Sequence, residues 1–233
     1  IMTIKANENK NLDITINKEK YLRITISTHT IMPNDDLLAT DKKYAADYLE
    51  DGDVLFVTEK IVAISQGRAY RLDEIEVRKF ATFLSKYVSK TPHGIGLGMP
   101  ETMEMALREC GTPRIFLASA VSALGKLFGR KGDFYRVAGP KARAIDGPTS
   151  GTIPPFNQYV VLGPDKPNEV AKEIKNLFNK DIEVIIVDIN DLGGNILGAS
   201  SKELDLDLFV DILKDNPLGQ AHQSTPLGII RKV

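Results

Sequence analysis

The chain has 233 residues, of which 42% are hydrophobic and 26% are charged, a composition typical of a globular protein with one large core or two small ones. Its 30 Lys and Arg against 31 Asp and Glu give a formal net charge of -1, which excludes a global field that recruits nucleic acid or an anionic membrane. The single Cys110 excludes an internal disulfide and, with only three His, a zinc site of the Cys/His kind. No apolar run approaches the roughly twenty residues of a membrane span, and the N-terminus lacks a signal-peptide core. We therefore expect a cytoplasmic protein with neither nucleic-acid nor membrane partners.

The first third of the chain combines two hydrophobic patterns. Near the N-terminus apolar and polar residues alternate with a period of two, as in strands with one buried face, whereas later segments repeat at helical spacing. Asp35 and Asp36 precede one of the helical segments and suit its N-cap. The expected elements are, in order, strands over 14–16 and 22–27, a helix over 37–49, a strand over 54–57 and a helix over 73–88.

The middle of the chain is rich in glycine. Residues 91–100 place glycines and prolines around His93, which predicts a loop. Gly125-Lys126 superficially suggests a phosphate-binding loop, but no Ser or Thr follows the lysine and the upstream glycine has the wrong spacing, so this motif is rejected. Residues 129–132 form a basic turn, a pattern found more often in solvated loops than in anion sites. Helices are expected over 101–109 and 114–128, the second as a buried helix because it is rich in small apolar residues.

The last third alternates strands and helices between polar turns. Asp146 opens a rigid turn, and residues 215–226 are polar and rich in turn-forming types. Without a repeat, a low-complexity segment or a clear linker, we expect one domain over residues 1–233, divided at most into two lobes. The expected elements are strands over 159–162, 184–187 and 227–230, and helices over 167–178 and 204–213.

The stretch 182–200 is the most informative, because a β-branched run ends there in polar residues and glycines. The run 184–187 suits a strand that is buried on both faces. Polar residues at the carboxyl end of such a strand stand at the rim of the sheet, where they can meet a ligand. Glycines beside them let the backbone approach that ligand or turn sharply. The alternative is a plain strand followed by an Asn/Asp/Gly turn. The polar residues are Asp188, Asn190 and Asp191, and the glycines are Gly193 and Gly194.

Several short blocks together resemble one family. They occur at 33–37, 51–55, 60–62, 66–68, 144–146, 161–165, 184–188 and 219–220. Their order matches the coenzyme F420:L-glutamate ligases, which are GTP-dependent gamma-glutamyl ligases. Each block is a weak signal alone, whereas the shared order makes the resemblance more specific. Residues 90–138 match poorly.

The resemblance implies a fold, a reaction and an assembly. The fold is mixed α/β (α+β) with mixed sheets, in two protomers intertwined as a homodimer. In the reaction, a nucleotide, GTP or ATP, phosphorylates a substrate carboxylate, and the amine of L-glutamate displaces phosphate from the acyl phosphate. Phosphoryl transfer of this kind uses Mg²⁺ or Mn²⁺ held by hard oxygen ligands.

The resemblance also implies site residues, although it assigns no catalytic one. The implied metal ligands are Asp146 and Asp188 for a first ion and Gln220 for a second, with Asn190 or Asp191 as substitutes for a family ligand. The implied nucleotide contacts are Thr28, His29, Thr30, Ile31, Thr149, Gly219 and Gln220. Cations suited to phosphate and to glutamate carboxylates are Arg68, Lys126, Arg130, Lys131, Arg136, Lys141 and Arg143. Aspartates at loop mouths are also common as caps and turn residues, which is the structural alternative for Asp146 and Asp188.

The chain departs from the family at three positions, and these departures leave several functions open. Ile189 stands where the family has a threonine, and Ala63-Ile64 stand where it has Ser-Lys, so a metal ligand and a phosphate cation are replaced. A metal-dependent ligase is the first hypothesis, and a non-catalytic nucleotide- or cofactor-binding protein of the same fold is the second. A structural or partner-binding protein is a third. The ligase hypothesis predicts that Asp146 and Asp188 approach each other, and that apolar strands near both termini are covered in a dimer.

Overall fold

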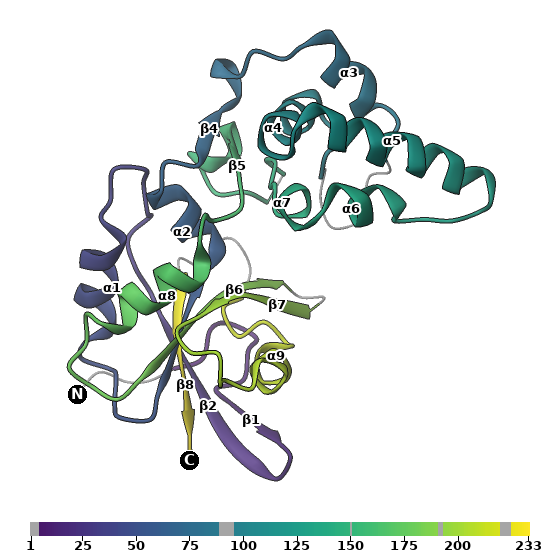
Figure 1. Cartoon of the computed structure of the whole chain (residues 1–233). Coiled ribbons are helices and arrows are strands. Elements are labelled where there is room, and N and C mark those ends of the chain that lie inside the picture. The colour runs from purple at the N-terminus through teal and green to yellow at the C-terminus, as the bar shows by residue number, and fades with distance from the viewer. Residues whose placement is uncertain (1–4, 89–95, 150, 191–192, 220–224) are drawn as a thin grey trace. The chain divides into compact units, whose positions relative to one another are not determined.

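The computed structural model describes residues 5–88, 96–149, 151–190, 193–219 and 225–233 (Figure 1). Mixed strands and helices confirm the expected α/β class. The chain divides into two compact units. Unit 1 comprises Ile1–Gln66 with Pro164–Val233, and unit 2 comprises Gly67–Gly163. Over the residues that the structure describes, none of the helices has both the length and the apolar character of a membrane span.

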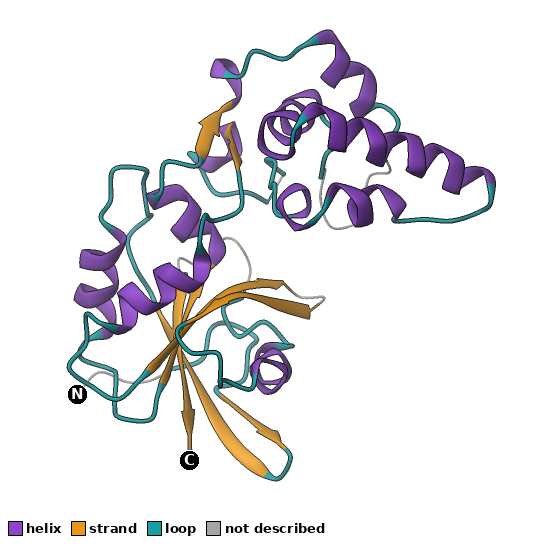
Figure 2. Ribbon diagram, viewed as in Figure 1, coloured by secondary structure: helices purple, strands orange, loops and turns teal. Residues whose placement is uncertain are grey.

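Unit 1 is built on a six-stranded mixed sheet with the order β1-β2-β8-β3-β6-β7 (Figure 2). Only β3 and β6 are parallel neighbours, and each other neighbouring pair is antiparallel. The strands are β1 Asp13–Ile16, β2 Glu19–Ile26, β3 Val54–Thr58, β6 Glu183–Asn190, β7 Gly193–Ala199 and β8 Leu227–Lys232. This sheet confirms four predicted strands, those over 14–16, 22–27, 54–57 and 227–230.

Helices cover both faces of this sheet, as Figure 1 shows. One face packs against α9, where Phe56, Ile185 and Phe209 share a buried apolar cluster. The other face lies under α2 and α8, and α1 packs against both of these helices. Burial on both faces explains the β-branched run in β6, because a central strand covered twice needs apolar side chains in both directions. The helices are α1 Leu37–Ala45, α2 Glu59–Ser65, α8 Pro167–Lys175 and α9 Leu206–Leu213.

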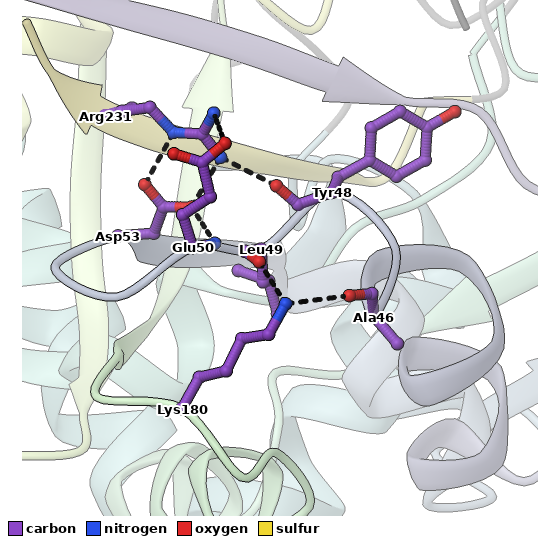
Figure 3. A network of polar contacts seen from close by, with 7 residues as sticks. All are labelled: Ala46, Tyr48, Leu49, Glu50, Asp53, Lys180 and Arg231. Carbon is purple, nitrogen blue, oxygen red and sulfur yellow. Dashed lines mark hydrogen bonds and ion pairs between the residues drawn. The ribbon is translucent and has the colours of Figure 1, made fainter. Parts of the chain in front are cut away.

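An ion pair between the partly buried Arg231 and the buried Asp53 ties the end of β8 to the turn before β3 (Figure 3). Arg231 donates two hydrogen bonds to the Asp53 carboxylate, at 2.9 and 2.8 Å, and one to Glu50 Oε1 at 2.7 Å. Its Nη2 also donates to the carbonyl of Tyr48 at 2.6 Å. The hydrogen bond with Asp53 raises the pKa of Arg231, so the guanidinium stays charged at this buried join. Lys180 adds hydrogen bonds to the carbonyls of Ala46 and Leu49.

Unit 2 is mainly helical. Its core joins side chains of α3, α4, α5 and α6 with Val160 and Leu162 of the chain around β5, and includes Leu97, Met103 and Ile115. A two-stranded antiparallel sheet pairs β4 with β5. The elements are β4 Ala69–Arg71, a 3-10 turn Leu72–Glu74, α3 Lys79–Ser85, α4 Pro100–Cys110, α5 Thr112–Leu127, α6 Asp133–Ala138, α7 Pro140–Arg143, a 3-10 turn Phe156–Gln158 and β5 Tyr159–Val161.

Several predicted helices are confirmed in type but differ in extent. The helix predicted over 37–49 ends at Ala45, and the one predicted over 73–88 is a 3-10 turn followed by α3 from Lys79. The helix predicted over 114–128 exists as α5, but the expectation that it is buried is wrong, since Phe116 is 59% and Leu127 is 79% exposed. Residues 91–95, half of the predicted loop over 91–100, lie outside the described residues, and α4 begins at Pro100.

Candidate functional site

Four strand ends of unit 1 meet along one side of the sheet. The parallel pair β3 and β6 ends together, with Thr58 opposite Val187. Strand β8 runs antiparallel and begins there, with Leu227 opposite both Val57 and Ile26 of β2. The amide of Thr58 donates to the carbonyl of Pro226 at 3.0 Å, which extends the join past the strand. We call this side the strand-end edge, defined by the carboxyl ends of β2, β3 and β6 and the amino end of β8.

The strand-end edge gathers several residues that the sequence predicts for ligand binding. The segment after β2 carries Thr28, His29, Thr30 and Ile31, the end of β6 carries Asp188 and Asn190, and Gly219 lies in the chain that leads back into β8. These residues come from distant parts of the chain, so the sheet topology brings them to one edge. Gln220 and Asp191 lie outside the described residues.

At the end of β6 two oxygen-bearing side chains share one face. Strand β6 continues past the predicted end at residue 187 to Asn190, because it pairs in a hairpin with β7, where Asp188 lies opposite Asn195. Gly193 and Gly194, expected beside a ligand or at a sharp turn, are the first two residues of β7. Residues two apart on a strand point the same way, so Asp188 and Asn190, both exposed, face away from Ile189. Ile189 instead packs against the core cluster under α9.

This donor pair has the chemistry of a hard-cation site. Carboxylate and amide oxygens are the ligands that Mg²⁺ and Mn²⁺ prefer, and Mg²⁺ usually takes one or two protein ligands together with waters and substrate phosphates. Asp188 and Asn190 fit that pattern. Among the described residues, no group of three His, Cys, Asp or Glu is arranged to hold a metal ion. Any further ligands would come from phosphate, water or the predicted residues outside the described ranges.

The segment after β2 is held by a hydrogen-bond chain around His29. Its Nδ1 lies 3.0 Å from the Tyr44 hydroxyl, and its Nε2 lies 3.0 Å from Asp35 Oδ2. The same Asp35 oxygen accepts the amide of Met32 at 2.7 Å. The Met32 amide, and then His29, lower the pKa of Asp35, so this carboxylate stays ionised and orients the imidazole. Ile31 is buried, so its side chain anchors the segment to the core.

Arg23 in β2 anchors the chain that leads from α9 to Gly219, and sequence reasoning missed this residue. Its side chain is fully buried, donates to the carbonyl of Ile212 at 3.1 Å and that of Asn11 at 2.7 Å, and forms an ion pair with Asp215. It therefore fixes the end of α9 and the start of the chain that leads to Gly219. Strand β2 also carries Glu19, Lys20 and Thr25, so its alternation gives no local sign that Arg23 is buried.

Asn7, near the N-terminus, binds the same segment between α9 and β8. Its Nδ2 donates to the carbonyl of Leu218 at 2.8 Å and to Thr225 Oγ1 at 2.9 Å. Thr225 in turn donates to the carbonyl of Leu218 at 2.8 Å. Asn216, with a positive φ of 51°, donates to the carbonyl of Gly219 at 2.9 Å. The residues on both sides of 220–224 are thus fixed by side chains from outside that stretch.

Asp146 and Thr149 belong to unit 2, where they lie on a rigid turn as predicted. The backbone of Asp146 exchanges two hydrogen bonds with Val161, at 2.8 and 2.9 Å, while its side chain is exposed. Thr149 donates its amide to Thr152 Oγ1 at 3.0 Å, and Thr152 returns its amide to the Thr149 carbonyl at 3.0 Å. Because Asp188 belongs to unit 1, its approach to Asp146 stays a prediction.

The cations predicted for phosphate binding have different surroundings. Arg68 donates to the carbonyl of Gly163 at 2.6 Å and forms an ion pair with Glu109, so its guanidinium already serves the fold of unit 2. Arg130 lies 3.3 Å from the buried carboxylate of Asp133. The side chains of Lys131, Lys141 and Arg143 are exposed to solvent.

A separate hollow in unit 2, with a volume of about 690 Å³, contains none of the predicted residues. Its floor is the buried Glu104, which Arg78 binds through both carboxylate oxygens at 2.8 to 3.1 Å. Burial opposes ionisation of Glu104, but the hydrogen bonds and charge of Arg78 outweigh it and lower the pKa of Glu104. The lining charges Glu76, Arg78, Glu104 and Arg108 cancel, so this hollow favours no charged ligand.

Comparison with known proteins matches most of the chain to one family. The profile of the F420-0:Gamma-glutamyl ligase family matches residues 25–197, a range that includes the segment after β2, the Asp146 turn, β6 and most of β7. A protein of Methanopyrus kandleri (strain AV19) named Coenzyme F420:L-glutamate ligase is 28% identical over 231 residues, which cover 86% of this chain and 82% of that protein. The segment around Gly219 lies beyond the family match.

Proposed function

The chain belongs to the F420-0:Gamma-glutamyl ligase family, and from that premise we propose that it is an acid–amino-acid ligase that joins L-glutamate to a carboxylate-bearing acceptor of the coenzyme F420 type. Family membership and the curated relative support the class of reaction. The convergence of Thr28 to Ile31, Asp188, Asn190 and Gly219 at the strand-end edge is the structural observation that carries the proposal.

In the proposed reaction two bonds form in sequence. An oxygen of the acceptor carboxylate attacks the γ-phosphorus of GTP, or of ATP, and the nucleoside diphosphate leaves. The amine of L-glutamate then attacks the activated carboxyl carbon, the C–O bond to phosphate breaks with its electron pair, and the amine gives its proton to solvent or to phosphate. Catalysis of such transfers rests on positioning and on electrostatic stabilisation rather than on a covalent enzyme intermediate.

The residues of the strand-end edge supply binding and orientation. Asp188 and Asn190 would hold Mg²⁺ or Mn²⁺ on the exposed face of β6. Asp146, Asp191 and Gln220 stay predicted ligands. The ion, when bound, neutralises charge on the phosphate oxygens. The hydrogen-bond chain from Tyr44 through His29 to Asp35 fixes the segment after β2 for the nucleotide, and its Thr30 is exposed.

Unit 2 would supply cations for the acidic substrates. Lys131, Lys141 and Arg143 are exposed and suit phosphate or glutamate carboxylates. Arg68 and Arg130 are less suited, because each would have to release Glu109 or Asp133 to bind an anion. Thr149 projects from the same rigid turn as Asp146 and stays a proposed nucleotide contact.

Turnover tests this proposal. The protein is incubated with GTP, Mn²⁺, L-glutamate and a panel of acidic cofactors, and the products are examined by mass spectrometry for addition of glutamate. Asp188→Asn should lower the rate by at least about a hundredfold, since it removes a charged ligand but keeps the shape. Asp211→Asn, at an exposed position of α9, is the matched control and should retain the rate. An unchanged rate for Asp188→Asn contradicts the site.

The alternative is a non-catalytic nucleotide- or cofactor-binding protein of the same fold. Ala63 and Ile64 favour it, because both are buried in α2 and place no cation where the family has Ser-Lys. Ile189 does not favour it, since this side chain faces the core while Asp188 and Asn190 keep their oxygens on the other face. Saturable binding of GTP without any glutamate addition across the panel would establish this alternative. The cytoplasmic location and the homodimer stay predictions.

A further inference from the structure

A second carboxylate stands at the strand-end edge, beside Asp188. Glu59 is the first residue of α2 and directly follows β3. The last register pair of the parallel strands β3 and β6 joins Thr58 to Val187. The next residue after each strand position is an acid, so Glu59 and Asp188 lie at the same level of the sheet on neighbouring segments.

Both acids belong to the same face of the sheet. Val187 and Ile189 pack in the apolar cluster under α9, so Asp188, which lies between them, points to the opposite face. Helix α2 covers that opposite face, since it packs against both β3 and β6. Glu59, as the first residue of α2, belongs to the face toward which Asp188 points.

The spacing of the two segments suits two ligands of one ion. Neighbouring strands lie about 4.8 Å apart. Two neighbouring oxygens of an octahedral shell, each about 2.1 Å from Mg²⁺, lie roughly 3 Å apart, so side chains of adjacent segments reach one ion by leaning together slightly. Asn190 lies on the same face as Asp188 and adds an amide oxygen. The edge thus offers two carboxylates side by side and an amide two residues further along β6.

The burial of Glu59 favours a cation beside it. Glu59 is half-buried and its Oε2 is withdrawn from solvent, whereas Asp188 is exposed. Withdrawing a carboxylate from water raises the free energy of its charged form, and a second carboxylate nearby raises it further. A divalent cation between Glu59 and Asp188 would offset both effects.

We propose that Glu59 is a third protein ligand of the divalent cation at the strand-end edge, together with Asp188 and Asn190. This inference rests on the proposed metal- and nucleotide-dependent function and adds one residue to its site. Three protein oxygens fill about half of the six positions that Mg²⁺ and Mn²⁺ favour, so phosphate oxygens and water still supply the rest.

Glu59 also makes nucleotide binding depend on the ion. The cation that the family has in α2 is replaced here by the buried Ile64. Without a metal ion, Glu59 faces the phosphates of GTP as a like charge, which weakens their binding. With the ion in place, the same carboxylate holds the cation that the phosphates bind. Removing the charge of Glu59 should therefore have opposite effects on GTP affinity in metal-free and metal-containing solution.

A purely structural role of Glu59 predicts a different pattern. Glu59 lies in the first turn of α2, where an acidic residue stabilises a helix through the helix dipole. In that role its replacement would lower the thermal stability and leave the affinity for Mn²⁺ unchanged.

Titration of Mn²⁺ into the metal-free protein without nucleotide, with the free ion followed by electron paramagnetic resonance, tests Glu59 as a ligand. Glu59→Gln keeps the shape of the side chain and should raise the Kd for Mn²⁺ at least about tenfold, because a charged ligand is lost. Glu173→Gln, the same change at an exposed position of α8, is the matched control and should keep the wild-type Kd. Circular dichroism of both variants establishes that they fold.

The affinity for GTP gives a second readout. Without metal, GTP should bind Glu59→Gln at least about threefold more tightly than the wild type, because a like charge is removed. With saturating Mn²⁺, GTP should bind Glu59→Gln at least about tenfold more weakly than the wild type. A structural role of Glu59 would not reverse the sign of the effect.

The outcomes separate this inference from the proposed function. Equal Mn²⁺ affinity of Glu59→Gln and the wild type, or a change of GTP affinity in the same direction with and without Mn²⁺, overturns the role of Glu59 alone. A wild type that binds neither Mn²⁺ nor GTP overturns the proposed function and this inference with it. Weaker Mn²⁺ binding by Glu59→Gln, in a protein that adds no glutamate to any acceptor, supports the ligand and contradicts only the ligase.

Discussion

Asp41 is a carboxyl group fully buried in α1, and neither oxygen has a hydrogen-bond partner in the part of the chain that the structure describes. Burial raises the pKa of Asp41 well above its ordinary value. The folded state therefore binds more protons than the unfolded state between about pH 3.9, the ordinary value, and the raised pKa. Stability should fall as the pH rises through that window.

Replacing Asp41 by Asn should remove this pH dependence, since the amide has a similar shape and does not ionise. Thermal unfolding of Asp41→Asn and the wild type should coincide near pH 4, and the variant should become the more stable protein as the pH rises toward 8. Asp47→Asn, at an exposed position beyond the same helix, should follow the wild type throughout. Parallel profiles of Asp41→Asn and the wild type would show that Asp41 does not titrate in this way.

Arg23→Lys should destabilise the protein although it keeps the positive charge. A lysine cannot reach Asp215 and the carbonyls of Ile212 and Asn11 together. Leaving buried carbonyls without donors should cost about 2 to 3 kcal/mol of unfolding free energy, measured with urea. Arg71→Lys, at an exposed ion pair with Asp73, is the control and should cause no measurable change. Equal stability of Arg23→Lys and the wild type contradicts the anchoring role.

At the scale of elements, local patterns predicted whether a segment is a helix or a strand. They predicted less well which other elements pack against it. The run 184–187 predicted a strand buried on both faces, but its continuation to Asn190 depends on pairing with β7, which alternation in β6 alone does not reveal. A run of small apolar residues likewise predicted α5, but such a run cannot say whether both sides of the helix are covered by the same chain. Arg23 was missed because its partners are up to 192 positions away.

Gly228 in β8 packs closely against the ring of Phe56, so a side chain at this position should lower the free energy of unfolding. A Cβ at this position would lie 2.2 Å from Cζ of Phe56, whose side chain is fully buried in β3. Gly228→Ala should therefore destabilise the protein by about 1 to 3 kcal/mol or more in urea unfolding, because the ring must shift within a packed core. Gly151→Ala, where a Cβ meets no atom within 4 Å, should be nearly neutral. A neutral Gly228→Ala would contradict this packing.

At the scale of the whole molecule, the order of weak blocks carried more information than any single block. It identified a family that the match over residues 25–197 shows, including residues 90–138, where the blocks had matched poorly. The candidate site was predictable only in part. Asp188, Asn190 and the segment after β2 were named from the sequence, whereas their meeting at one edge follows from the order β2-β8-β3-β6, which needs pairings between distant segments.

Metal and nucleotide binding at the strand-end edge should be mutually dependent. Asp188 and Asn190 supply one charge and two oxygens, too few for tight binding of a divalent ion without phosphate oxygens. GTP should therefore strengthen the binding of Mn²⁺, and Mn²⁺ should strengthen the binding of GTP by the same factor. Gln220→Ala should reduce this coupling while leaving the fold intact.

Calorimetric titration of Mn²⁺ into the protein, with and without saturating GTP, tests that dependence at the strand-end edge most directly. We expect GTP to tighten Mn²⁺ binding by at least about tenfold in the wild type and in the control Asp211→Asn, and to have almost no effect in Asp188→Asn. Equal Mn²⁺ affinity with and without GTP, or full coupling in Asp188→Asn, would contradict a nucleotide and metal site at this edge.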